Sequence, residues 1–97
     1  MKNINTINNP KYAPRILRKP EVIALTTLSK SSLYNRIQDG LMPPSISLGA
    51  RAVGFIASEI EAVLDAYCQE KTPEQIKALV QELIANRTNT LPKRLSQ

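Results

Sequence analysis

One short segment of the chain carries polar side chains at a spacing that suits the reading of base pairs. Ser31, Asn35 and Gln38 fall on the same side of a helix that turns by about 100° per residue. The opposite side carries two aliphatic side chains, Leu33 and Ile37. Hydroxyl and amide groups match the hydrogen-bond donors and acceptors that base edges present in the major groove of DNA. This segment is therefore a candidate recognition helix.

Basic and aromatic side chains next to this face extend the candidate site. Lys30 and the free amides of the first helical turn can meet a phosphate, which the helix dipole also favours. Asn35 and Arg36 are expected to contact base edges. Tyr34 either donates to a phosphate or packs against a neighbouring hairpin, and the sequence favours neither role. The predicted DNA-contacting residues are Arg18, Lys30, Ser31, Ser32, Tyr34, Asn35, Arg36, Gln38 and Arg51.

Capping and turn residues predict two short helices joined by a tight turn. Proline is favoured in the first turn of a helix, which places one helix at about Pro20 to Thr26. Ser29 is a good N-cap for a second helix from Lys30 to Asp39, and Gly40 can take the left-handed conformation that ends it. Because Pro43-Pro44 prevents any helical continuation, the segment is a helix-turn-helix candidate.

A small β-hairpin is expected after the double proline. Ser45–Leu48 alternates polar and apolar residues, and Ala52–Ile56 is β-branched and aromatic around a glycine. Arg51 lies at the predicted tip, where it can reach phosphates or a narrow minor groove rather than act as a solvated turn residue. Since an isolated hairpin is marginally stable in water, its apolar side chains must pack in part on the helices. Those side chains are Ile46, Leu48, Val53 and Phe55.

Two further helices are predicted in the C-terminal half. Ser58 and Glu61 have the spacing of a capping box, so one helix should begin there. Thr72 and Gln75 repeat the signal before a helix from about Pro73 to Asn86. An apolar stripe along this last helix consists of Ile76, Leu79, Val80, Leu83 and Ile84. The stripe suits either a dimer contact or packing on the preceding helix, and the sequence does not decide between them.

The predicted fold is mainly α with a small β-hairpin, a winged helix-turn-helix followed by an extra C-terminal helix. With 97 residues, the chain fits one small domain with extensions. We expect a flexible N-terminal arm at residues 1–14, a winged helix-turn-helix DNA-binding domain at 15–70, a C-terminal helix at 71–86 and a flexible basic tail at 87–97. The arm is expected to be flexible because it is rich in asparagine and lacks periodicity.

The charges of the chain are divided between its two halves. The net charge is +5, and residues 15–55 hold six basic side chains against two acidic ones. Residues 56–86 hold six acidic side chains against two basic ones. A polyanion such as DNA is therefore expected to face the N-terminal half.

The composition argues against catalysis and against a bound metal or cofactor. The chain contains one cysteine and no histidine, so neither an intramolecular disulfide nor a usual zinc ligand set can form within it. It also lacks a glycine-rich phosphate loop and the usual acid–base or nucleophilic groups. No apolar stretch is long enough to span a bilayer, and the N-terminus does not resemble a signal peptide. We therefore expect a cytoplasmic protein that is not an enzyme and has neither a cofactor nor a small-molecule substrate.

Several segments occur in the order, and near the spacing, of a known family. They are Arg15–Val22, Leu28–Tyr34, Gly40–Pro44, Leu48–Phe55 and Ser58–Glu61. On these segments the chain resembles the AlpA family of prophage regulatory proteins over about residues 15 to 69. The resemblance implies a winged helix-turn-helix similar to those of MerR-type and excisionase-type proteins, with the recognition helix at Ser29–Asp39 and the wing at Ser45–Ile56. Phe55 and Ala50 depart from the family, which commonly has tryptophan and glycine there, and the last helix lies outside the resemblance.

The leading hypothesis is a sequence-specific, double-stranded DNA-binding regulator of transcription. The resemblance implies that it controls phage or genomic-island genes such as an integrase. One small domain has a small footprint, so specificity is expected to come from a homodimer or from several copies on repeated sites. One alternative is an excisionase-like factor that bends DNA near an integration site. Another is an adaptor that binds a partner protein through the C-terminal helix.

Overall fold

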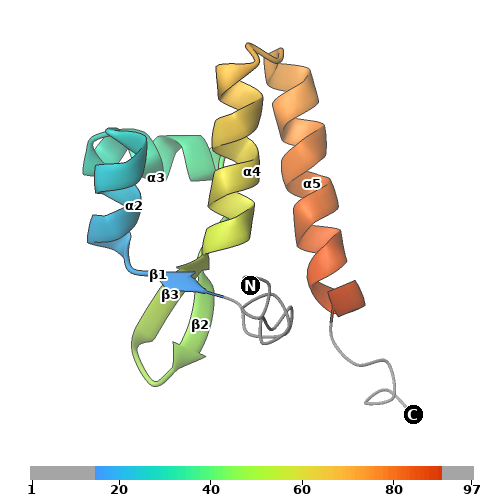
Figure 1. Cartoon of the computed structure of the whole chain (residues 1–97). Coiled ribbons are helices and arrows are strands. Elements are labelled where there is room, and N and C mark those ends of the chain that lie inside the picture. Colours follow the sequence, from blue (N-terminus) through green and yellow to red (C-terminus); the bar gives the residue numbers. More distant parts are fainter. Residues whose placement is uncertain (1–14, 91–97) are drawn as a thin grey trace, which may run out of the picture.

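Four helices and a three-stranded antiparallel sheet form the described part of the chain, residues 15–90 of the computed structural model (Figure 1). In chain order the elements are β1 (Ile16–Leu17), α2 (Lys19–Thr26), α3 (Lys30–Gln38), β2 (Ile46–Gly49), β3 (Ala52–Ile56), α4 (Ala57–Cys68) and α5 (Pro73–Thr90). The predicted fold class is confirmed. The predicted arm at 1–14 and residues 91–97 lie outside the described residues.

The cap of α3 and the glycine after it are those that the sequence indicates, whereas α2 begins one residue before the predicted Pro20, with Arg18 as its N-cap. The backbone N–H of Arg18 donates to the carboxylate of Glu21 at 2.7 Å, which closes the first turn of α2. The hydroxyl of Ser29 accepts a hydrogen bond from the backbone N–H of Ser32 at 3.1 Å, which confirms the predicted cap of α3. Gly40 follows α3 with a φ of 78°, a conformation that costs glycine little.

The sheet contains a strand that the sequence did not predict. Its order is β1-β3-β2, and both pairings are antiparallel. Ile16 pairs with Ile56 and Leu17 pairs with Phe55. The predicted two-stranded wing forms as the hairpin of β2 and β3, and β1 adds a third strand to it. A strand of two residues is too short to show a period, and its partner lies far along the chain, so no local pattern indicates it.

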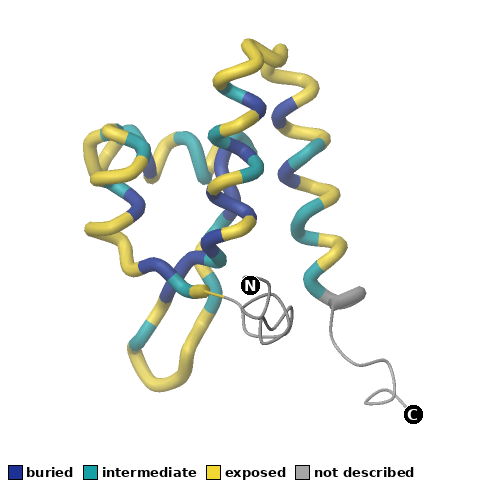
Figure 2. Tube along the Cα trace, viewed as in Figure 1, coloured by how far each residue is buried: buried dark blue, intermediate teal, exposed yellow. Residues whose placement is uncertain are grey.

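The hairpin of β2 and β3 projects away from the helices (Figure 1). Only part of its apolar surface is covered, since Phe55 is 2% exposed and Ile46 is half-buried. Leu48 and Val53 are each 44% exposed, so the expectation that they pack on the helices is wrong. Both lie toward the tip of the hairpin, where the backbone is drawn as exposed in Figure 2. Pairing with β1 anchors the base of the hairpin and leaves its tip in solvent.

The N-cap of α4 lies two residues before the predicted cap, Ser58, and the helix begins by a different mechanism. Strand β3 runs directly into the helix, with Ile56 as its N-cap. The N–H of Ala57 donates to the carbonyl of Arg15 at 2.9 Å, so the residue before β1 satisfies a first-turn amide. Ser58 lies inside the helix, and its predicted capping box with Glu61 does not form. Glu61 instead lies 3.5 Å from the guanidinium of Arg15.

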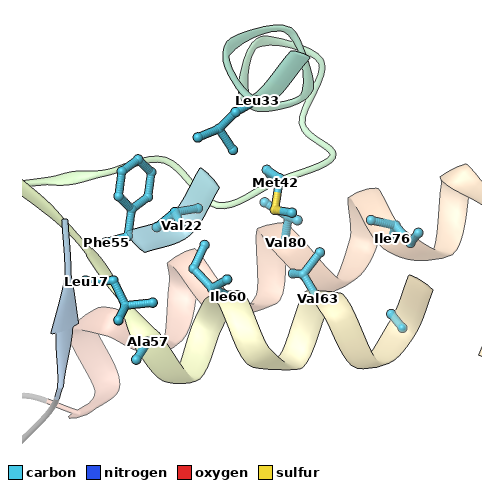
Figure 3. Close-up of a cluster of buried hydrophobic side chains, with 11 residues drawn as sticks. Leu17, Val22, Leu33, Met42, Phe55, Ala57, Ile60, Val63, Ile76 and Val80 are labelled. Carbon is cyan, nitrogen blue, oxygen red and sulfur yellow. The ribbon is translucent and has the colours of Figure 1, made fainter. Parts of the chain in front are cut away.

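One buried core joins the helix-turn-helix, the sheet and α5 around α4 (Figure 3). Its members are Leu17, Val22, Leu33, Met42, Phe55, Ala57, Ile60, Val63, Ala66, Ile76 and Val80. Ile76 and Val80 of α5 are 2% and 1% exposed, and the other apolar residues of its stripe pack against the same core. Of the two uses that the sequence left open for this stripe, the structure therefore shows packing within the chain.

Helix α5 begins at the predicted capping box and runs further than predicted. The side chains and backbone N–H groups of Thr72 and Gln75 form both reciprocal hydrogen bonds, at 2.9 and 3.1 Å. The helix continues to Thr90, so the assignment of residues 87–90 to a flexible tail is wrong. Arg87 lies on the helix and binds the buried carboxylate of Glu59. These two residues are 28 positions apart, which is why the charge pattern gives no sign of the contact.

We predict that Gly54→Ala lowers the free energy of unfolding by about 1–3 kcal/mol, measured by urea denaturation. A Cβ atom at this position would overlap Cγ2 of Ile16 and would lie 3.1 Å from Cδ1 of Leu48. As a control, Val53→Ala on the same strand should lower it by less than about 1 kcal/mol, because Val53 is 44% exposed. Wild-type stability of Gly54→Ala would contradict the observed packing of β1 on β3.

Candidate nucleic-acid interface

Helix α3 presents the predicted polar face to solvent. Ser31, Asn35 and Gln38 are all exposed. On the opposite side Leu33 is 2% exposed, and Ile37 is half-buried against the core. Burial of these two aliphatic side chains fixes the rotation of α3 about its axis. The hydroxyl and amide groups are therefore held outward, in the arrangement that major-groove reading requires.

An open hollow of about 530 Å³ lies beside the N-terminal end of α3. Its lining combines the basic side chains of Lys19 and Lys30 with Tyr34 and the apolar Leu33 and Ile37. Lys30 is the first residue of α3, and the first turn of this helix contains no acidic side chain. Two lysines next to a helix N-terminus make this end of α3 suitable for a phosphate group.

Lys19 is a candidate contact that the sequence reasoning missed. It is exposed at the start of α2 and lines the same hollow as Lys30. The sequence does indicate that Lys19 lies at the start of a helix, because it immediately precedes Pro20. Only the crossing of α2 and α3 brings the two lysines to one site.

Tyr34 belongs to the solvent-facing part of α3. Its side chain is 61% exposed and lines the hollow near Lys19 and Lys30. Exposure of this size favours the role of a phosphate donor over packing against the hairpin. Ser32 is half-buried, and its backbone N–H is engaged by the Ser29 cap. Ser32 is therefore less exposed to solvent than Ser31.

Arg36 does not share the outward face of α3. Its guanidinium carbon lies 5.4 Å from the ring centroid of Tyr67 on α4, the geometry of a cation–π contact. The hydroxyl of Tyr67 in turn donates to the carbonyl of Leu41 at 3.0 Å. In this conformation Arg36 contacts α4. Its side chain therefore lies away from the polar face that Ser31, Asn35 and Gln38 form.

The remaining predicted contacts lie away from α3. Arg51 is exposed in the turn between β2 and β3, next to Ala50 and Gly49, which both have positive φ. Arg18 is exposed immediately before α2. In Figure 1 α2 and α3 lie on one side of α4 and α5 lies on the other, while the hairpin extends from the lower end of α4. The basic side chains therefore occupy the elements that α5 does not cover.

Two properties of residues 15–90 limit other kinds of site. In this part of the chain no group of three or more histidine, cysteine, aspartate or glutamate residues could hold a metal ion. Its helices are all too short or too polar to cross a bilayer.

Comparisons with known proteins assign residues 15–67 to a family described as prophage CP4-57 regulatory protein (AlpA). The uncharacterized protein ORF88 of Enterobacteria phage P4 is 46% identical over 48 residues, which cover 50% of this chain and 54% of ORF88. The chain thus matches about half the length of that relative. The DNA-binding transcriptional activator AlpA of Escherichia coli (strain K12) is 33% identical over 67 residues, which cover 63% of this chain and 96% of that protein. No solved structure shows significant similarity to the chain.

We predict that Arg36→Ala lowers the free energy of unfolding by about 0.5–1 kcal/mol, because the contact with Tyr67 is lost. Chemical denaturation followed by circular dichroism measures the change. Lys30→Ala is the control on the same helix and should stay within about 0.5 kcal/mol of wild type, since Lys30 is exposed. Equal stability of the two variants would show that the contact with Tyr67 does not hold α3.

Proposed function

The chain belongs to the AlpA family of prophage regulatory proteins, and from that premise we propose that it is a sequence-specific regulator that binds double-stranded DNA. The observation that carries the proposal is the outward polar face of α3, Ser31, Asn35 and Gln38, backed by the buried Leu33. A relative with matching sequence, AlpA of Escherichia coli, is described as a DNA-binding transcriptional activator.

In the proposed complex, α3 enters the major groove with its polar face toward the base edges. Lys19 and Lys30 meet phosphates at the N-terminal end of the helix. Arg51, at the tip of the hairpin, contacts the backbone or the neighbouring minor groove. Base reading therefore depends on Asn35 and its neighbours, while the lysines and Arg51 supply affinity that depends little on sequence.

The proposed targets are prophage or genomic-island genes, such as a gene for an integrase. One small domain contacts few base pairs, so we expect specificity to come from a homodimer or from several copies bound to repeated sites. A dimer would need a surface other than the apolar stripe of α5, because Ile76 and Val80 are buried within the chain. The same burial argues against an adaptor that binds a partner through that stripe.

We predict that Asn35→Ala reduces the preference for the specific site by about 1–3 kcal/mol, through loss of a base contact. Fluorescence anisotropy with duplexes from its own promoter or attachment site, and with a random duplex, measures the preference. Gln81→Ala, on the exposed side of α5, is the matched control and should leave the preference unchanged. Equal binding of wild-type protein to all duplexes would refute the specific-regulator proposal.

Lys30→Ala should instead weaken binding to all sequences by a similar factor. Since one phosphate contact is lost, the slope of log K against log salt concentration should fall by about 1. Titrations at several salt concentrations, on the specific and the random duplex, test this. A loss confined to the specific duplex would mean that Lys30 reads bases.

A further inference from the structure

The loop that connects the recognition helix to the wing is held at both ends by side chains from α4 and α5. The hydroxyl of Tyr67 on α4 donates to the carbonyl of Leu41 at 3.0 Å. Nη2 of Arg87 on α5 donates to the carbonyl of Pro44 at 2.9 Å. Between these two carbonyls the loop is buried, and Met42 is 1% exposed and lies within the core (Figure 3). The path from α3 to β2 is thus fixed by contacts with the last two helices.

Arg87 is itself held in one orientation by a buried carboxylate. Its Nε and Nη2 donate to the two carboxylate oxygens of Glu59, both at 2.7 Å. Glu59 is only 5% exposed. The hydrogen bond with Glu59 raises the pKa of Arg87 above its ordinary value, with burial opposing the rise and the charge of Glu59 adding to it. Rotation of Arg87 away from Pro44 would leave a buried charge without its partner, which is costly.

Tyr67 acts at the other end of the loop in a comparable way. Its ring lies under the guanidinium of Arg36, near the C-terminal end of α3. Its hydroxyl meanwhile binds the carbonyl of Leu41, just after that helix. One side chain therefore contacts both the recognition helix and the start of the loop.

We propose that Tyr67 and Arg87 are positioning residues for DNA binding, which set the orientation of the wing relative to α3. The inference rests on the proposed function and adds a role for α5, which lies outside the matched residues 15–67. A protein that contacts DNA through a helix and a hairpin at once gains affinity when both are held in the bound arrangement beforehand. Release of the loop would let the hairpin, and Arg51 at its tip, move independently of α3.

Two substitutions test the proposal with little change of volume. Tyr67→Phe removes one hydroxyl and keeps the ring beside Arg36. Arg87→Lys keeps the charge but lacks the planar fork that reaches the carboxylate of Glu59 and the carbonyl of Pro44 together. Glu82→Gln, on the exposed side of α5, is the control.

The first measurement is independent of DNA. Amide chemical shifts of residues 46–56 in the free protein should change in Tyr67→Phe and in Arg87→Lys but not in Glu82→Gln. If Arg87→Lys fails to fold, the double variant Glu59→Leu/Arg87→Met removes the ion pair without leaving an unpaired buried charge and takes its place. Unchanged hairpin amides in folded variants overturn the proposal.

The second measurement tests whether the contribution of Arg51 to DNA binding depends on the contacts that hold the loop. Arg87→Lys should weaken binding to the specific duplex by about tenfold through lost preorganisation. Arg51→Ala should then cost a smaller factor in the Arg87→Lys background than in wild type, because a released hairpin already contributes less. Equal factors in the two backgrounds overturn the proposal. If wild-type protein preferred no duplex, the proposed function would be refuted. The role of Tyr67 and Arg87 in holding the hairpin would still be tested by the amide chemical shifts, which do not depend on DNA.

Discussion

A buried carboxylate that requires a partner constrains the arrangement of most of the molecule. Glu59 lies near the start of α4 and is almost fully removed from water, which costs several kcal/mol unless the charge is paired and hydrogen-bonded. Arg87 pairs with it through both carboxylate oxygens and also binds the carbonyl of Pro44. One interaction thus connects α5, α4 and the chain that enters the wing. The apolar core contains side chains from the same two helices, α4 and α5.

The chain separates the surface that can meet DNA from the surface that supports it. The helix-turn-helix and the hairpin expose Lys19, Lys30 and Arg51, together with the polar face of α3. Most of the acidic residues belong to α4 and α5, and two of them, Glu59 and Glu61, pair with arginine. The positive charge on the helix-turn-helix and the hairpin favours approach of a polyanion from the side of α3.

Helix α5 is an integral part of the folded unit although the family match ends before it. Its apolar stripe completes the core, and Arg87 pairs with the buried carboxylate of Glu59. A small domain buries a limited fraction of its surface, so an added helix that covers α4 increases the apolar area removed from water. This accounts for the use of the stripe within the chain.

The sequence by itself determined those elements whose signals are local. Helix α3 and its outward face could be predicted because their signals act within a few residues. These signals are the Ser29 cap, the turn at Gly40 and the spacing of Leu33 from Ser31 and Asn35. Tertiary structure alone decided the third strand, the start of α4 and the partners of Arg36 and Arg87. Each of these depends on groups far apart in sequence, whose pairing is chosen by burial and by hydrogen-bond geometry after the helices have packed. Periodicity and charge counts contain no information about such pairings.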